Sequence, residues 1–275
     1  MMNRRSAART FIPAFSRLTL LCLLAGSVPA GVLAAWSAPG EDFSGELTVG
    51  GPVTDNRTPW RWKLMPGETD MSLRAGDRVS RGGEQVWSGL LTARPVLLGN
   101  TPLALPAGRE GLAPKVRYGG PGPETTPNWL SDGEAWMTLP VYDGAAPDAL
   151  AGYFRFRLRA AMLLRHTAGG QPVYAGIYND LSGNGLPPEG RALPAARLAG
   201  MLCGQSGGDG PAWVCGSGVS VTTYLPLSRL TDGRLRQLQG VYGAETVAGS
   251  GELFLREGAM PARWKTTLHV SIEYQ

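Results

Sequence analysis

The chain has 275 residues, which is enough for one large domain or two small ones. Hydrophobic residues make up 43% and charged residues 17%, so the composition supports a packed core and excludes an intrinsically disordered chain. The formal net charge is +4, but Arg4, Arg5, Arg9 and Arg17 precede the first long apolar run and the remainder is close to neutral, which argues against a nucleic-acid partner. The 39 glycines and 22 prolines divide the sequence into short runs, which favours many strands over long helices and agrees with the all-β fold predicted below.

A secretory signal peptide is predicted at residues 1–35. The basic start is followed by an apolar stretch, Leu18–Val28, and then by small residues. The stretch is too short to span a membrane. Cleavage after Ala34 fits the small-x-small rule, whereas cleavage after Ala35 would leave Trp36 as the first residue of the mature chain.

Two of the three cysteines remain after processing. Cys22 lies inside the apolar stretch without a small residue beside it, so it is interpreted as part of the signal peptide and not as a lipid-attachment site. Cys203 and Cys215 form an even pair in an exported protein, which predicts a disulfide worth about 3 kcal/mol. A metal site would need further ligands, and the two histidines, His166 and His269, are remote in sequence.

Residues 42–54 (DFSGELTVGGPVT) alternate between apolar and polar side chains. One parity forms an apolar edge: Phe43, Leu47, Val49 and Val53. Gly45 interrupts this edge with a residue that has no side chain, where another backbone could approach closely. The segment is therefore predicted to be a strand with one apolar edge and one polar edge.

The body of the chain is predicted to contain many strands separated by Gly/Pro turns. The expected strands are 60–65, 94–99, 114–118, 135–142, 152–164, 219–225, 241–247 and 252–256. In the run Gly152–Leu164, apolar residues alternate with Arg155, Arg157 and Arg159. This arginine row is interpreted either as a patch for a receptor or anion, or as an ordinary solvated strand face that discourages edge aggregation.

The middle of the chain, about 167–218, is irregular and rich in Gly and Pro. It is predicted to be a loop-rich insertion on a β scaffold, the kind of region where binding specificity often resides. One short helix is expected near Ala195–Leu202 and a second around Ser228–Gln239, where Leu230, Leu235 and Leu238 could share a face.

The last predicted strand, Trp264–Gln275, has the clearest alternation in the chain. Its apolar face contains Trp264, Leu268, Val270, Ile272 and Tyr274. Alternating segments near both ends suggest polymerisation by strand addition, in which main-chain hydrogen bonds give affinity and alternate side chains fill pockets. A body that lacks one strand would expose a groove that a chaperone fills first and the next subunit fills later.

Several blocks of the sequence resemble one family over nearly the whole mature chain. These blocks are DFSGELTVGGPVT followed by PWRWK, then RPVLLGNT, GREGLAPKVRYG and the final WKTTLHVSIEYQ. They resemble the Fae-type fimbrial subunits of enteric bacteria, in which a tryptophan begins the mature chain. The resemblance therefore favours cleavage after Ala35, which places Trp36 first.

The resemblance implies an incomplete immunoglobulin-like β-sandwich that is completed by donor-strand complementation. By position, the donor-strand residues would be Phe43, Gly45, Leu47, Val49 and Val53. The strand beside the open groove, gripped by a periplasmic chaperone, would present Trp264, Leu268, Val270, Ile272 and Tyr274. The expected organisation is a signal peptide at 1–35, a donor-strand extension at 36–54, and a pilin domain at 55–275 with an insertion around 167–218.

The resemblance also implies partners and a location. The partners would be the periplasmic chaperone, an outer-membrane usher and neighbouring subunits, with no cofactor, no metal and no enzymatic activity, in a fimbrium on the cell surface. Blocks such as RHTAGGQPVYAGIYNDL and GVYGAETVAGSGEL resemble the minor subunits of the family more than its adhesin. A structural minor subunit is therefore expected, and an adhesin that binds a host glycan is the alternative.

Three weaker patterns have competing interpretations. Gly204–Gly208 (GQSGG) matches a nucleophile-elbow string around Ser206, as in a secreted hydrolase, but a flexible loop beside a disulfide is favoured. Asp180–Gly185 resembles half of a calcium loop, yet Arg191 occupies the position that requires a bidentate Glu. Core packing is favoured over sugar stacking for the tryptophans, which are Trp129, Trp136 and Trp213.

Overall fold

The strands and helices of this computed structural model lie in residues 58–68, 71–119, 126–258 and 260–275, the parts of the chain that the structure describes, all within the unit Thr54–Gln275. The strands are β1 (Arg61–Leu64), β2 (Val79–Arg81), β3 (Glu84–Trp87), β4 (Arg94–Asn100), β5 (Leu105–Ala107), β6 (Pro114–Gly119), β7 (Asn128–Trp129), β8 (Glu134–Asp143), β9 (Leu150–Ala168), β10 (Gln171–Tyr178), β11 (Val221–Pro226), β12 (Arg236–Thr246), β13 (Glu252–Arg256), β14 (Trp264–Lys265) and β15 (His269–Tyr274). The helices are α1 (Ala195–Ser206) and the 3-10 turns η1 (Ala75–Asp77), η2 (Ala212–Cys215) and η3 (Leu227–Thr231).

The strands form one large sheet and one small sheet, as expected for an all-β sandwich. The large sheet has the order β1-β4-β12-β9-β13-β3-β2 with antiparallel neighbours, and β8, β10 and their partners join it along β9. The small sheet is the antiparallel pair β15-β6. The prediction of an all-β fold is confirmed.

The long strand β9 organises the large sheet because it has two different neighbours along each edge. One edge pairs first with β8 and then with β10, and the other pairs first with β13 and then with β12. Apolar side chains from Phe154 to Met162 alternate into the core and the arginines face outward, as predicted. From Ala160 to Leu164 every residue is buried, because α1 covers the outer face at Ala161 and Leu163.

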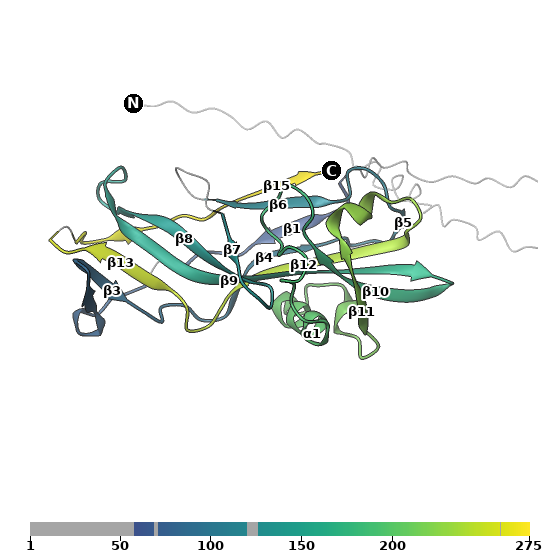
Figure 1. Cartoon of the computed structure of the whole chain (residues 1–275), viewed down its shortest axis with the longest axis horizontal. Helices are drawn as coiled ribbons and strands as arrows, with labels where there is room; N and C mark the ends of the chain where they lie inside the picture. The colour runs from purple at the N-terminus through teal and green to yellow at the C-terminus, as the bar shows by residue number, and fades with distance from the viewer. Residues whose placement is uncertain (1–57, 69–70, 120–125, 259) are drawn as a thin grey trace, which may run out of the picture. The chain divides into compact units, whose positions relative to one another are not determined.

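The molecule is therefore layered, with α1 on one face of the large sheet and the β6-β15 pair on the other (Figure 1). The main core lies between the two sheets and includes Tyr118, Met137, Leu158 and Tyr242. The smaller core lies under α1, where Leu198 packs with residues of β9 and β12. Burial on both faces of one sheet explains why the apolar run in β9 loses its alternation.

Strand β1 is held by two tryptophans that lie over glycines of neighbouring strands. A Cβ added at Gly99 of β4 would lie 2.3 Å from the Trp62 ring, and one added at Gly240 of β12 would lie 2.4 Å from the Trp60 ring. Trp60 and Trp62 also stack on each other with ring centroids 5.3 Å apart. The glycines provide the space that these large rings occupy.

Two expectations about helices had different outcomes. The predicted helix near Ala195–Leu202 is confirmed as α1, which extends to Ser206 and ends at Gly207 with φ 54°, a left-handed cap that glycine adopts readily. The second predicted helix, Ser228–Gln239, is wrong. Only the single turn η3 forms, and β12 begins at Arg236 because Leu238 pairs with β5 and is buried in the main core.

The irregular insertion predicted at 167–218 begins later than expected. Its first part forms β10, which returns along β9 after a turn at Gly169 and Gly170, both with positive φ, and then pairs in parallel with β11. The high Gly and Pro content of this region suggested loops, so the partly buried strand β10 was not predicted. The remainder, between β10 and β11, contains α1 and η2 as its regular elements within the described residues.

The single C-terminal strand predicted at Trp264–Gln275 is broken into two. Strand β14 pairs with β8 in the large sheet, whereas β15 pairs with β6 in the small one. Between them the chain crosses from one sheet to the other, and the Thr266 hydroxyl donates to the Pro140 carbonyl at 2.8 Å. Apolar and polar residues continue to alternate through the crossing, because the even-numbered residues of both strands face the main core.

Candidate functional site

The C-terminal strand β15 has an apolar row that the protein covers incompletely. Val270, Ile272 and Tyr274 face the main core but are only half-buried, and they alternate with exposed polar residues. On the neighbouring strand β6, the inward residues Val116 and Tyr118 are fully buried, at 3% and 0% exposure. The inward row of β15 therefore borders a part of the core that the described residues cover only in part.

The backbone edge of β15 that faces away from β6 has no strand partner among the described residues. Strand β1 is in the same situation, because within that part of the chain it pairs only with β4. Leu64, at the end of β1, has the same parity as Trp62 in this strand and Trp60 just before it, yet it is 61% exposed. Within the described residues, two strand edges with apolar side chains are thus left without a strand partner.

A side-chain hydrogen bond joins these two edges. The indole nitrogen of Trp62 donates to the Tyr274 hydroxyl at 2.8 Å, although β1 and β15 belong to different sheets. Trp62 also contacts Tyr242 of the core edge-on, with ring centroids 5.4 Å apart. The bond therefore connects inward residues of β1 and β15 across the two sheets.

A buried tyrosine pair anchors β6 beneath β15. Tyr242 donates to the Gly185 carbonyl at 2.7 Å, so Tyr118 must donate the 2.8 Å bond between the two hydroxyls. Burial raises the pKa of both phenols, against a smaller opposing effect of the hydrogen bond on Tyr118. Both side chains are therefore neutral donors that fix the position of β6 and, through it, of β15.

The outward side of β1 contacts the loop that follows α1. Lys63 Nζ lies 2.7 Å from Asp209 Oδ2, and Arg61 donates to the Asp209 carbonyl at 3.3 Å. The Lys63 ammonium lowers the pKa of this carboxyl. A cavity of about 250 Å³ lies beside the contact, lined by residues of β1, β4, β12 and the end of α1. The loop after α1 thus contacts outward side chains of β1, one of the two strands with an open edge.

The structure separates the residues that the sequence placed together at the C-terminal strand. Val270, Ile272 and Tyr274 share β15, but Trp264 lies on β14, where it pairs with β8, and Leu268 lies in the crossing between them. The position of β1 beside β15 could not be predicted from the sequence. The shared parity of Trp60 and Trp62 was the available signal, but it does not identify their neighbours.

The predicted signal peptide (1–35) and donor-strand residues lie outside the described residues. The latter are Phe43, Gly45, Leu47, Val49 and Val53.

The predicted disulfide is present. Cys203 in α1 and Cys215 in η2 are joined, with their Cα atoms 5.1 Å apart. Ser206, the residue of the nucleophile-elbow string, ends α1 and donates to the Cys203 carbonyl at 2.9 Å. A nucleophile elbow requires a strand before the serine and a helix after it, whereas here the helix comes first. Ser206 therefore has a structural role at the C-terminal end of α1.

The loop at Asp180–Gly185 contributes to the fold. The Tyr118 backbone N–H donates to Asn184 Oδ1 at 2.6 Å, and Asn184 Nδ2 donates to the Tyr118 carbonyl at 3.0 Å. The Asn184 side chain therefore covers the edge of β6 that faces away from β15. Asp180 accepts hydrogen bonds from the backbone and side chain of Ser228. Within the described residues no group of three or more His, Cys, Asp or Glu side chains could hold a metal ion.

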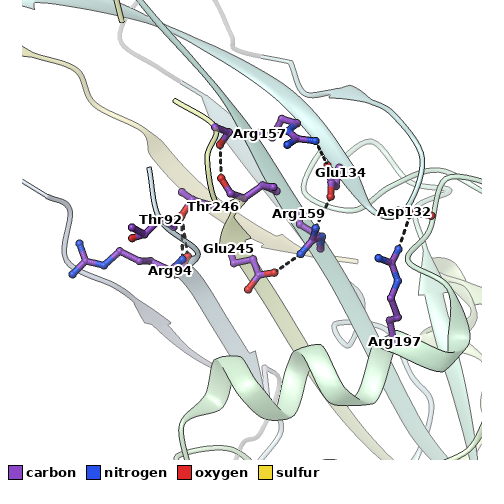
Figure 2. Close-up of polar contacts among 11 residues, drawn as sticks. Thr92, Arg94, Asp132, Glu134, Arg157, Arg159, Arg197, Glu245 and Thr246 are labelled. Atoms are coloured by element: carbon purple, nitrogen blue, oxygen red, sulfur yellow. Dashed lines mark hydrogen bonds and ion pairs between the residues drawn. The ribbon is translucent and has the colours of Figure 1, made fainter. Parts of the chain in front are cut away.

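The arginine row of β9 is partly neutralised by carboxylates (Figure 2). Glu134 pairs with Arg157 at 3.1 Å and with Arg159 at 2.5 Å, and Arg159 also pairs with Glu245 at 2.8 Å. This network ties β8, β9 and β12 together across the outer face of the large sheet. These two arginines therefore have structural partners, which favours the solvated-face interpretation for them.

Comparison with known proteins agrees with this architecture. A family model described as "Fimbrial, major and minor subunit" matches residues 16–275. The K88 minor fimbrial subunit FaeI of Escherichia coli is 46% identical over 259 residues, which cover 94% of this chain and 99% of that relative. In the described residues no helix is long and apolar enough to cross a bilayer. The resemblance predicted from the sequence blocks is confirmed, and the chain belongs to the K88 family of fimbrial subunits.

Proposed function

We propose that this chain is a structural minor subunit of a fimbrium and that it joins its neighbours by exchange of a β-strand. The observation that supports this most directly is the half-buried row Val270, Ile272 and Tyr274 on a strand whose outer edge has no partner among the described residues. An added strand between β15 and β1 would extend both ladders and cover this row. Similarity to the FaeI minor subunit supports the structural role.

The segment that would be donated to the next subunit is residues 42–54. Its alternate apolar residues suit a groove lined by core side chains, and each buried side chain contributes about 1.5–3 kcal/mol. Before assembly, an exported subunit with an incomplete core needs a partner that covers β15, which is the role of a periplasmic chaperone. An outer-membrane usher would then exchange the chaperone for the next subunit. In this account the protein has no catalytic role, and Ser206 is a helix-end residue.

Deletion of Phe43–Val53 tests the donor role. We expect export and chaperone binding to persist, because the acceptor edges are intact, while incorporation into the fibre is lost. A matched pair of variants refines the test by parity. Replacing Leu47 and Val49 by Asp should block incorporation, whereas replacing Ser44 and Thr48 by Asp should be tolerated. Normal incorporation of the deletion variant would refute the proposal.

The acceptor side needs its own test, because the same strand would bind first the chaperone and then the donor. Ile272→Asp places a charge in the inward row of β15 and should abolish the one-to-one complex with the chaperone. Ser271→Asp changes the neighbouring outward residue and should leave that complex intact. Equal binding by both variants would contradict the assignment of β15 as the acceptor strand.

A further inference from the structure

The outward face of β1 carries two cations that share one carboxylate. Arg61 and Lys63 are exposed and alternate with Trp62, which packs against the main core. Within the described residues, Asp209 is the carboxylate that pairs with them, 2.7 Å from Lys63 Nζ. Arg61 instead donates to two neutral oxygens, Asn100 Oδ1 at 2.8 Å and the Asp209 carbonyl at 3.3 Å. This end of the strand edge is therefore locally positive.

The backbone of β1 places these two cations beside any strand that is added to its open edge. The Met65 N–H donates to the Val96 carbonyl of β4 at 2.9 Å. Because the backbone groups of successive residues in a strand point to opposite edges, those of Leu64 and Trp62 point away from β4. An added strand would bond to these groups, and its outward side chains would lie across from the two cations.

The Asp209 contact leaves the cations accessible to a second carboxylate. Asp209 lies in the loop closed by the Cys203–Cys215 disulfide, where its N–H donates to the Ser206 carbonyl at 2.9 Å. The side chains of Lys63 and Asp209 are 56% and 69% exposed. An ion pair as exposed as this one contributes little to stability. An incoming carboxylate can therefore share Lys63 without disturbing the fold.

The N-terminal extension of the chain has the complementary charge. Residues 36–56 include Glu41, Asp42, Glu46 and Asp55 but no Lys or Arg. Glu46 lies at the centre of the alternating segment 42–54, and its parity is opposite to that of the apolar edge. In a strand whose apolar edge fills the groove, the Glu46 carboxylate would therefore face outward.

The opposite side of the acceptor site has no comparable excess of charge. The outward residues of β15 are His269, Ser271 and Glu273. Glu273 lies 3.8 Å from Lys115 of β6, so the carboxylate on this strand already has a cation. The cations that an acidic donor strand would meet are therefore those of β1.

We propose that Arg61 and Lys63 select donor strands that carry an outward carboxylate, and that Glu46 in the extension of a second copy of this chain supplies it. This inference rests on the strand exchange proposed above. The apolar row provides most of the affinity, and the charge pair sets the register, because opposite charges across a strand pair attract and like charges repel. A donor strand with an outward Lys or Arg at this position would be disfavoured.

The test is titration of the mature chain with fluorescent synthetic peptides of residues 42–54. We expect the Glu46→Gln peptide to bind about threefold more weakly than the unchanged peptide and the Glu46→Lys peptide about tenfold more weakly. Both differences should shrink in 1 M salt, roughly the concentration at which exposed charges are screened within about 3 Å. In the chain, Lys63→Gln should weaken binding of the unchanged peptide about threefold.

Arg81→Gln is the matched control for the chain. It removes the same charge from β2, the strand at the opposite edge of the large sheet, and should leave peptide binding unchanged. An exchange of charge completes the test. Lys63→Glu should bind the Glu46→Lys peptide more tightly than the unchanged peptide, which reverses the original preference. Because Lys63 is exposed, both of its variants should fold.

The possible results separate this inference from the strand exchange on which it rests. Reversal of the preference by Lys63→Glu supports the charge pair. Equal binding of the three peptides by the unchanged chain would overturn the charge pair and leave strand exchange standing. No binding of the unchanged peptide, including the case in which the extension of the same chain occupies the edge, would overturn both.

Discussion

The Trp62 indole nitrogen donates a hydrogen bond to the Tyr274 hydroxyl at 2.8 Å, across 212 residues of sequence. The two residues lie on β1 and β15, which are the two strands with an unpaired edge at the proposed acceptor site. The bond connects the large sheet to the small one at the position where an additional strand would lie. Its strength can therefore be measured as a property of the acceptor site.

A double-mutant cycle of Trp62→Phe and Tyr274→Phe should give a coupling energy of about 1 kcal/mol, the net value of one such bond. Trp62→Phe also loses packing over Gly99, but this contribution cancels in the cycle. The measurement is urea unfolding of the four proteins. Strict additivity of the two single changes would show that the bond is absent in solution.

The glycines under the two tryptophans give a second prediction. Gly99→Ala and Gly240→Ala should each destabilise the protein by about 1–3 kcal/mol, because the new Cβ would overlap an indole ring. Gly200→Ala is the matched control. It lies in α1 with nothing within 4 Å of its Cβ position, so the change should stabilise by about 0.5–1 kcal/mol. Three equal values from chemical denaturation would be inconsistent with this packing.

Most of the strands could be predicted because their signal is local. Strand β13 was predicted at its observed bounds, and the parity of Val270, Ile272 and Tyr274 followed from simple alternation. Leu230, Leu235 and Leu238 were misleading, because helical spacing over so short a segment was outweighed by pairing of Leu238 with β5. The break between β14 and β15 is not visible in the sequence, since the even-numbered residues of both strands pack against the main core.

The candidate site was predictable only on one side. Alternation identified β15, but nothing in the sequence shows which strand lies opposite it. The relation of Trp62 to Tyr274, and of each tryptophan to its glycine, depends on contacts between segments far apart in the chain. Trp136 illustrates the same limit. It was grouped with Trp129 and Trp213 by residue type, and only the fold distinguishes a surface ring from two packed ones.

The disulfide should stabilise the insertion. Replacing Cys203 and Cys215 together by Ser should lower the free energy of unfolding by about 3 kcal/mol on the chain-entropy model, since the bond closes a short loop between α1 and η2. Strand exchange should survive, because the closed loop contacts β1 through the exposed side chains of Arg61 and Lys63 and not through the ladder of β1 with β4. Denaturation and fibre incorporation measure the two effects. An unchanged unfolding midpoint in the double variant would contradict the stabilising role.

The histidine His166 should make the folding stability of the protein sensitive to acid. Burial lowers the pKa of its imidazole, and its Nδ1 has no hydrogen-bond partner within the described residues. A lowered pKa means that the unfolded chain binds the proton more readily. The stabilisation that neutral, buried His166 gives to the folded state is therefore complete above pH 6.5, the unperturbed pKa of histidine. It is lost as the pH falls below that value.

Unfolding free energies of His166→Gln measured between pH 5 and 8 check this expectation. Below pH 6.5 the unfolding free energy of this variant should fall less than that of the unchanged chain. His269→Gln alters the exposed histidine of β15 and should retain the full decline. If both variants follow the unchanged chain, the acid sensitivity has another source.

Hydrogen–deuterium exchange of the mature chain, with and without a synthetic peptide of residues 42–54, tests the incomplete fold most directly. Without peptide, amides on the outer edges of β1 and β15 should exchange rapidly, and addition of peptide should protect them while β4 and β6 remain unchanged. A peptide with Leu47 and Val49 replaced by Asp should give no protection. Slow exchange at both edges in the chain alone, unaffected by peptide, would contradict the account.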